Sequence, residues 1–169
     1  MIVLRFEQAV LPHLDAAYNL ARWLLRDTHD AEDILQQACL SAFKAFDRFR
    51  GNDARVWLMT IVRNACFTHL RSRRGGPKEL LDDLLPAPMT QSDPQLALLH
   101  RLDREALAAA VEALPAIFRE AFVLREMEGL SYQEIADVAG VPVGTVMSRL
   151  SRARERLAES LKDLAVQES

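Results

Sequence analysis

The segment GLSYQEIADVAGVPVGTVMSRLSRARERL, residues 129–157, has the pattern of two short helices that cross at a tight turn. Ser131 and Glu134 stand at the spacing of a capping box, which marks the start of the first helix. Ala136 is small enough to let a second helix approach closely, and Gly140 suits the left-handed residue of the turn. The segment therefore predicts a helix-turn-helix.

The second helix of this unit has two distinct faces. Four apolar residues at helical spacing are expected to face the core: Val146, Leu150, Ala153 and Leu157. The opposite face, which would enter the major groove of DNA, carries Met147, Ser148, Ser151 and Arg152. The flanking arginines, which suit phosphates, are Arg149, Arg154 and Arg156. The competing interpretation is a helical hairpin whose basic face is only solvated.

Helical periodicity extends through most of the remaining chain, and no segment alternates like a strand. We expect Pro12 to break the first helix, Asp27 to cap the second, and Asn52 or Asp53 to cap the third. The expected helices span 5–26, 27–46, 55–74, a stretch from about Gln95, and Pro115 to about Glu128. The segment GGP at 75–77 ends the long third helix, and residues 78–94 contain three prolines and form a linker.

The charges are segregated along the chain, although the net charge is only −3. Residues 55–74 contain five arginines and no acid, and residues 149–156 contain four arginines and one acid. Between these two basic patches, residues 79–93 contain four acids and neither Lys nor Arg. Nucleic-acid binding requires local positive potential rather than a positive total, so this pattern is compatible with a DNA-binding protein.

Other classes of protein are disfavoured. The start of the sequence lacks the basic segment and apolar run of a signal peptide, so we expect none. No stretch approaches the ~20 apolar residues of a membrane span. Cys39 and Cys66 stand far apart in apolar helical patterns, which predicts buried free thiols. The four histidines lack metal-ligand spacing and no Gly-rich phosphate loop is present, so we expect no metal, cofactor, small-molecule substrate or catalysis.

Two long motifs resemble one known family. LREMEGLSYQEIADVAGVPVGTVMSRLSRARERL closely resembles region 4 of the extracytoplasmic-function (group IV) sigma factors of bacterial RNA polymerase. RDTHDAEDILQQACLSAFKAFDRFRGNDARVWLMTIVRNACFTHLRSRR resembles their region 2, and the order, linker and length also fit. The resemblance implies an all-α protein of two small helical domains joined by a flexible linker. The expected boundaries are 1–74 for region 2, 75–94 for the linker and 95–169 for region 4.

The resemblance also implies a function. The protein would bind core RNA polymerase through the β′ coiled coil and the β flap, recognise the −35 and −10 elements of promoter DNA, and help open the −10 region. It would act in the cytoplasm under the control of an anti-sigma factor. The polymerase-binding surface would be formed by Asp30, Glu32, Asp33, Gln36 and Gln37, the last at a position where the family often has Glu. The acidic linker would thread through channels of the polymerase.

For the −10 element, the resemblance implies a loop that forms a pocket for a base flipped out of the duplex. That loop corresponds to Arg50, Gly51, Asn52 and Asp53. On the following helix, Asn64 and Phe67 would line the surface for the single strand. Arginines of this helix would hold phosphates, namely Arg63, Arg71, Arg73 and Arg74. We assign Trp57 to the core because it lies in the apolar stripe.

For the −35 element, the resemblance implies that the second helix of the helix-turn-helix reads base edges. The matched residues, including flanking phosphate contacts, are Arg125, Thr145, Met147, Ser148, Arg149, Ser151, Arg152 and Arg154. Many relatives have a basic residue at the position of Met147. Because Met cannot donate a hydrogen bond to guanine, we expect a preference shifted toward contact with a thymine methyl group.

Two rival interpretations belong to other classes. A stand-alone helix-turn-helix regulator would bind duplex DNA without polymerase, but such proteins usually begin with a βα receiver pattern that this chain lacks. An enzyme acting on nucleic acid could use the acids of DAED, residues 30–33, to hold Mg²⁺. Acids at the start of a helix more commonly cap it, so both rivals rank below the sigma-factor interpretation.

Overall fold

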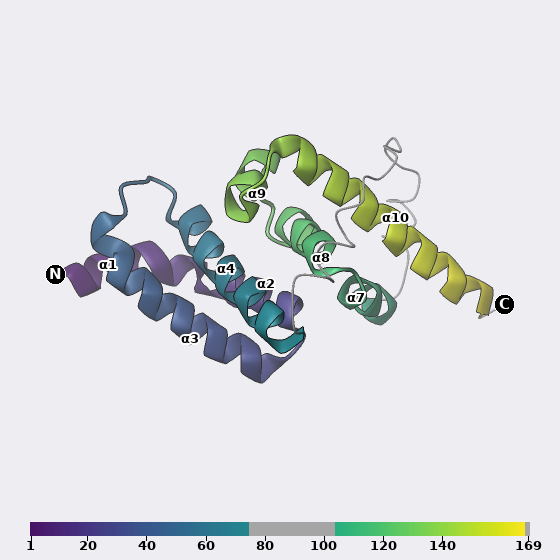
Figure 1. Cartoon of the computed structure of the whole chain (residues 1–169), viewed down its shortest axis with the longest axis horizontal. Helices are drawn as coiled ribbons and strands as arrows, with labels where there is room; N and C mark the ends of the chain where they lie inside the picture. Colours follow the sequence, from purple (N-terminus) through teal and green to yellow (C-terminus); the bar gives the residue numbers. More distant parts are fainter. Residues whose placement is uncertain (75–103, 168–169) are drawn as a thin grey trace.

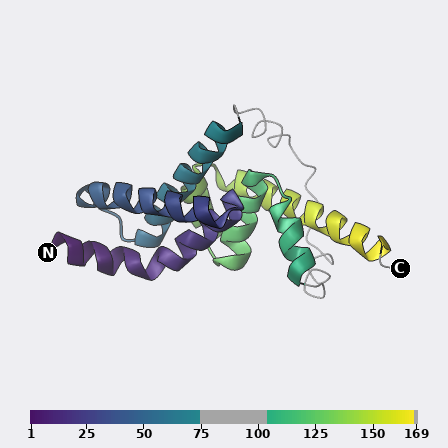
Figure 2. The same cartoon turned by 90° about the horizontal axis from the view of Figure 1, so that it is seen from below.

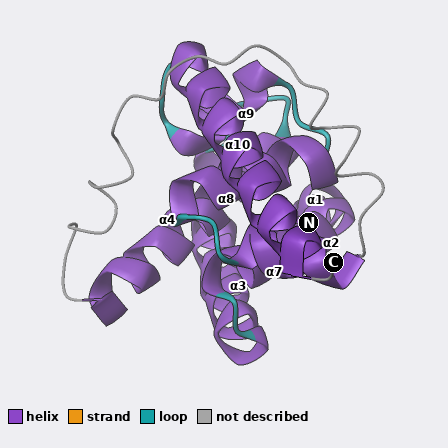
Figure 3. Ribbon diagram, turned by 90° about the vertical axis from the view of Figure 1, so that its right-hand side faces the viewer, coloured by secondary structure: helices purple, strands orange, loops and turns teal. Residues whose placement is uncertain are grey.

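The computed structural model describes residues 1–74 and 104–167, and this part of the chain is built from helices without strands (Figures 1 and 3). Residues 1–74 form the N-terminal half and residues 104–167 the C-terminal half. The predicted all-α class is confirmed. The predicted linker at 78–94 and the predicted helix start near Gln95 lie outside the described residues.

The N-terminal half contains α1 (Ile2–Val10), α2 (Leu14–Leu25), α3 (Thr28–Ala45) and α4 (Ala54–Arg74). Pro12 interrupts the first predicted helix as expected, because a 3₁₀ turn over Leu11–His13 separates α1 from α2. Asp27 caps α3 by accepting a hydrogen bond from the backbone N–H of Asp30 at 2.9 Å. Asp53 caps α4 in the same way, from the N–H of Val56 at 3.1 Å.

Helices α3 and α4 bury their apolar faces against α2, and α1 contacts α4. The first two helices, purple in Figure 2, run alongside α3, while α4 contacts both α2 and α3. The core that they share contains Leu20, Leu24, Ala38, Leu58, Met59, Val62 and Cys66, each at most 1% exposed. At the far end, an aromatic cluster joins Trp57 to Phe49, whose ring centroid lies 4.6 Å away. Trp57 is half-buried in this cluster and packs against the core, as predicted.

The C-terminal half contains α7 (Arg104–Glu112), α8 (Ala116–Phe122), α9 (Tyr132–Ala139) and α10 (Val143–Gln167). The predicted helix-turn-helix is α9 and the start of α10. The capping box of Ser131 and Glu134 is present, and Gly140 is left-handed with a φ of 68°. The four residues predicted to face the core are all buried, namely Val146, Leu150, Ala153 and Leu157.

One predicted helix differs in detail. Instead of one α-helix from Pro115 to about Glu128, α8 ends at Phe122 and a π-helical turn, η4, spans Val123–Met127. Gly129, with a φ of 68°, then ends the helical run as predicted. An α-helix joins backbone N–H and C=O groups four residues apart, and a π-helix joins groups five residues apart. A single turn of either kind leaves the same apolar pattern in the sequence, so this π turn could not be predicted.

The two halves are packed against each other, with α2 against α8 and α4 against α9 (Figure 1). Arg119 of α8 is 2% exposed and donates from Nη2 to the carbonyl oxygen of Leu24 at 2.8 Å. Asn19 donates from Nδ2 to a carboxylate oxygen of Glu128 at 2.6 Å. The prediction of two domains on a flexible linker contained no such contact. Among the described helices, none combines the length and apolar character needed to cross a bilayer.

The turn of the helix-turn-helix offers a matched pair of glycines. A Cβ at Gly140 would meet nothing within 4 Å, so the cost of Gly140→Ala is the strained left-handed backbone, about 1–2 kcal/mol. Gly144 lies in the first turn of α10 with equal open space, and Gly144→Ala should stabilise the protein by about 0.5–1 kcal/mol. Urea unfolding of both variants should give free-energy changes of opposite sign, and equal signs would contradict the assigned turn.

The two thiols should differ in reactivity. Cys66 is fully buried, and burial raises the pKa of its thiol to about 12. Cys39 is half-buried, and burial raises its pKa as well. Because the thiolate is the reactive form, we expect a thiol reagent at pH 8 to modify Cys39 slowly and Cys66 only after unfolding. The single variants Cys39→Ser and Cys66→Ser assign each phase, and rapid modification of Cys66 in the native protein would contradict the fold.

Candidate nucleic-acid interface

The outer face of α10 is presented as the sequence predicts, close to the turn. Met147 is 48% exposed, and the neighbouring Thr145, Ser148, Ser151 and Arg152 are half-buried. Ser148 donates its hydroxyl to the carbonyl oxygen of Gly144 at 3.0 Å, which fixes its rotamer. This face carries an apolar tip beside hydroxyl groups and a guanidinium, and these groups can contact base edges and phosphates.

The arginines around this face have different environments. Arg154 pairs with Glu126 at 3.1 Å, in a contact that remains partly exposed. Arg125, from the π turn, donates to the carbonyl oxygen of Leu130 at 2.9 Å and lies 4.5 Å from the centre of the Tyr132 ring. Arg149 is 9% exposed, so in this arrangement it does not flank the DNA-reading face as an available phosphate contact.

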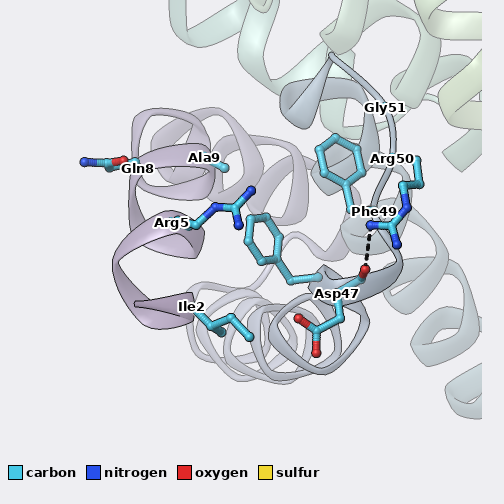
Figure 4. A pocket seen from close by; sticks show the side chains of 9 residues that line it. Ile2, Arg5, Gln8, Ala9, Asp47, Phe49, Arg50 and Gly51 are labelled. Atoms are coloured by element: carbon cyan, nitrogen blue, oxygen red, sulfur yellow. Dashed lines mark hydrogen bonds between the residues drawn. The ribbon is translucent and has the colours of Figure 1, made fainter.

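The loop before α4 borders a pocket of about 750 Å³. Its lining is Ile2, Arg5, Gln8, Ala9, Phe46, Asp47, Phe49, Arg50 and Gly51. Arg5 and Arg50 lie on opposite sides of it, and Nη1 of Arg50 donates to the carbonyl oxygen of Asp47 at 2.9 Å (Figure 4). A Cβ at Gly51 would lie 3.1 Å from the ring of Phe49, so glycine permits this close approach of loop and ring.

This pocket combines an aromatic wall with two cations. Its volume lies within the ~300–1,000 Å³ typical of small-ligand sites. Arg50 and Gly51 were predicted to form it, whereas Asn52 and Asp53 are exposed in the same loop but do not line it. Asp53 instead caps α4. Sequence reasoning missed Arg5 and Gln8, because only the fold brings α1 beside this loop.

The DNA-binding residues predicted on α4 differ in exposure, and Arg63 is engaged by Glu120 of the C-terminal half. Asn64 and Arg71 are exposed, and Arg73 is 62% exposed while pairing with Asp30 at 2.6 Å. Phe67 is only 2% exposed, and the guanidinium of Arg63 lies 4.0 Å from its ring centre. Arg74 is the last residue of α4, and its side chain lies outside the described residues.

Most of the predicted polymerase-binding surface is exposed on α3. Glu32, Asp33, Gln36 and Gln37 face solvent. Asp30 differs, because its carboxylate lies 2.6 Å from Arg73 and 3.5 Å from His69, and so joins the start of α3 to α4. In this structure Asp30 therefore links two helices of the N-terminal half.

An apolar pocket of about 640 Å³ continues this surface toward α1. Gln36, Cys39, Leu40 and Phe43 line it from α3, and Leu40 is 62% exposed. Phe43 is 40% exposed as well. Leu40 could have been noticed in the sequence, because it lies one turn after Gln36 and off the buried stripe of α3.

Residues 9–75 match the family model Sigma-70 region 2, and residues 104–157 match the family model Sigma-70, region 4. RNA polymerase sigma-H factor of Pseudomonas aeruginosa is 34% identical, over 94% of this chain and 87% of that protein. ECF RNA polymerase sigma factor SigM of Mycobacterium tuberculosis is 38% identical, over 92% of this chain and 76% of that protein.

A similar solved structure is that of the sigma factor RpoE in complex with the anti-sigma factor NepR from Bartonella quintana. It superposes with a TM-score of 0.71 at 34% identity, over 94% of this chain and 97% of that chain. The helix-turn-helix of α9 and the start of α10 falls within the region 4 match, and α4 with the preceding loop falls within the region 2 match. The chain therefore belongs to the sigma-70 family, among its extracytoplasmic-function RNA polymerase sigma factors.

Proposed function

We propose that this protein binds core RNA polymerase, directs it to promoters through the −35 and −10 elements, and helps to open the −10 region. The observation that carries the proposal is the pairing of an exposed helix-turn-helix face with an acidic docking face, on halves that match region 4 and region 2 in that order. The protein itself has no catalytic chemistry in this proposal, and it acts in the cytoplasm, where the polymerase is found.

At the −35 element, the start of α10 lies in the major groove in this proposal. Met147 contacts a thymine methyl group, and Ser148, Ser151 and Arg152 contact base edges. Arg125 and Arg154 contact phosphates from the two sides. The present partner of Arg154 is a partly exposed carboxylate, and such surface ion pairs contribute only about 0–1 kcal/mol, so a phosphate can replace it.

At the −10 element, the loop pocket receives a base that has left the duplex. Unstacking a base costs a few kcal/mol, and stacking on an aromatic side chain returns about 1–3 kcal/mol. The Phe49 ring supports the pocket wall, and Arg5 and Arg50 supply positive charge for the adjoining phosphates. Asn64, Arg71 and Arg73 continue the path of the single strand along α4.

The docking surface for the polymerase combines charge and apolar area. Glu32 and Asp33 attract basic groups, while Gln36 and Gln37 supply hydrogen bonds beside them. Leu40 and Phe43 add an apolar patch that a monomeric protein would not need. We assign both parts to one interface with the β′ coiled coil, because Gln36 belongs to both. The described surface of the C-terminal half would meet the β flap.

Regulation by an anti-sigma factor is part of this proposal. The similar RpoE structure was solved with such a factor bound. An autonomous regulator is disfavoured, because the N-terminal half matches region 2 over most of its length.

Binding to core RNA polymerase tests the proposal. The purified protein should bind core polymerase at sub-micromolar concentration and bind promoter duplex alone only weakly, with strong dependence on salt. Reversing two charges, Glu32→Lys with Asp33→Lys, should weaken core binding about tenfold or more. The control is Asp15→Lys, which reverses a charge at an exposed position of α2 outside the proposed docking surface. Tight DNA binding without affinity for core polymerase would overturn the proposed function.

The base preference at −35 tests the role of Met147. Met147→Arg adds a bidentate donor that guanine accepts, worth about 1–3 kcal/mol of discrimination at a single position. The measurement is transcription by the holoenzyme on templates carrying each base at each −35 position. Leu164→Arg places the same charge at an exposed site near the end of α10 and should leave the profile unchanged. An identical profile for Met147→Arg and wild type would remove Met147 from the reading face.

A further inference from the structure

The apolar pocket beside the acidic face of α3 has its second wall on α1. From α3, residues between Leu35 and Phe43 line it on three successive turns. At about 1.5 Å per residue these turns extend for about 12 Å, the length of about two turns of an α-helix. From α1, Val3, Phe6 and Val10 line it at helical spacing. The pocket therefore follows two helices that run side by side, and a ridge of side chains from a third helix fits its length (Figure 2).

Large apolar side chains at this pocket are exposed to solvent. Val3 is 53% exposed, Leu11 of the following 3₁₀ turn is 56% exposed, and Leu40 of α3 is 62% exposed. All three line the pocket. Single exposed apolar residues are common on protein surfaces, whereas a cluster of them marks a site of interaction. We therefore expect another molecule to cover this pocket in the working protein.

Aromatic contacts fix the spacing of α1 and α3 at this pocket. The ring of Phe6 meets the ring of Phe43 edge to face, with centroids 5.3 Å apart. Phe6 also meets Phe46 in the same geometry at 5.4 Å. Because α1 contacts α4 as well, the wall that it forms is attached to the rest of the N-terminal half. The pocket is thus formed before a partner arrives, which avoids the cost of ordering it on binding.

The charges around the pocket are acidic. Among the described residues that line it, Glu7 carries a charge and no Lys or Arg is present. Gln36 lines it from α3, and the exposed Glu32 and Asp33 lie one turn before Gln36. A partner that suits this surface has apolar side chains flanked by basic groups. An amphipathic helix carries both on one face and is commonly bound in such apolar grooves.

The wall formed by α1 lies largely outside the family match. The region 2 match covers residues 9–75, whereas Val3, Phe6 and Glu7 precede it. The resemblance to the family implies a polymerase contact on α3 but none on this part of α1. A role for α1 follows from the pocket alone.

We propose that α1 is a second wall of the polymerase-docking surface, and that one helix of the β′ coiled coil packs its apolar side chains between α1 and α3. This inference rests on the proposed function, which places the β′ coiled coil on α3. The pocket is continuous with that surface through Gln36, and Glu7 attracts basic groups of the same partner helix from the side of α1. A second copy of the chain is the poorer occupant, because a symmetric contact would set the same acidic edge against itself.

Neighbouring positions on α1 test this role. Val3 and Leu4 are 53% and 56% exposed, but of the two only Val3 lines the apolar pocket. Val3→Arg should weaken binding to core polymerase about fivefold or more, as expected for an apolar contact inside an interface. Leu4→Arg adds the same charge one residue away and should leave the affinity unchanged. A folded Val3→Arg protein that binds core polymerase as tightly as Leu4→Arg would overturn the role of α1.

Thiol protection locates the contact even if Val3→Arg does not fold. Val3→Cys and Leu4→Cys are each placed in a Cys39→Ser background, in which the remaining native thiol, Cys66, is buried. Mass spectrometry of the labelled peptide compares maleimide labelling of the free chain with labelling of the chain bound to core polymerase. Binding should slow the labelling of Val3→Cys much more than that of Leu4→Cys. Equal labelling rates of Val3→Cys in the free and bound chain would refute the contact.

The proposed function and the role of α1 can fail independently. Core binding that is lost in the Glu32→Lys with Asp33→Lys variant but unchanged in Val3→Arg would retain the proposed function and reject the role of α1. A wild-type chain that does not bind core polymerase would reject both. A wild-type chain that sediments as a dimer, with Val3→Arg as a monomer of unchanged core affinity, would assign the pocket to a second copy instead.

Discussion

The relation between the two halves depends on the carboxylate of Glu120. Removing an isolated charge from water costs several kcal/mol, and this carboxylate is 1% exposed. It is tolerated because α4 delivers Arg63 from the other half, and because Arg149 adds a second positive charge. Separating the halves would exchange Arg63 for water, whereas Arg149 stays in the same half as Glu120. The ion pair therefore specifies one closed arrangement more than it adds stability.

The packing of the two halves against each other leaves some of the proposed functional surfaces exposed and engages others. It leaves Met147 on α10, the loop pocket beside Arg50 and the acidic face of α3 open to solvent. It pairs Arg63 of α4 with Glu120 of α8. One arginine of the proposed −10 surface is thus engaged within the protein, whereas the other proposed surfaces are accessible.

Several site residues could be assigned from the sequence, and others could not. Met147 was placed correctly on an exposed face, because helical period and the turn at Gly140 determine which residues face outward. Asn64 and Phe67 look equivalent in the sequence, since they lie three residues apart on one helix. Only Phe67 is buried, because it faces the hydrophobic core while Asn64 faces solvent. Asp30 was grouped with its acidic neighbours, yet Arg73 and His69 engage it from α4.

Local chemistry in the sequence determined the helices, their caps and the helix-turn-helix. Asp27, Asp53, Ser131 and Gly140 act on backbone groups within a few residues of themselves, so their effects are independent of the rest of the fold. Contacts between segments far apart in the chain were decided only by the tertiary structure. The pairing of Arg63 with Glu120, 57 residues away, depends on how α4 and α8 meet. No local pattern encodes that meeting, because burial and charge compensation arise only when both helices are in place.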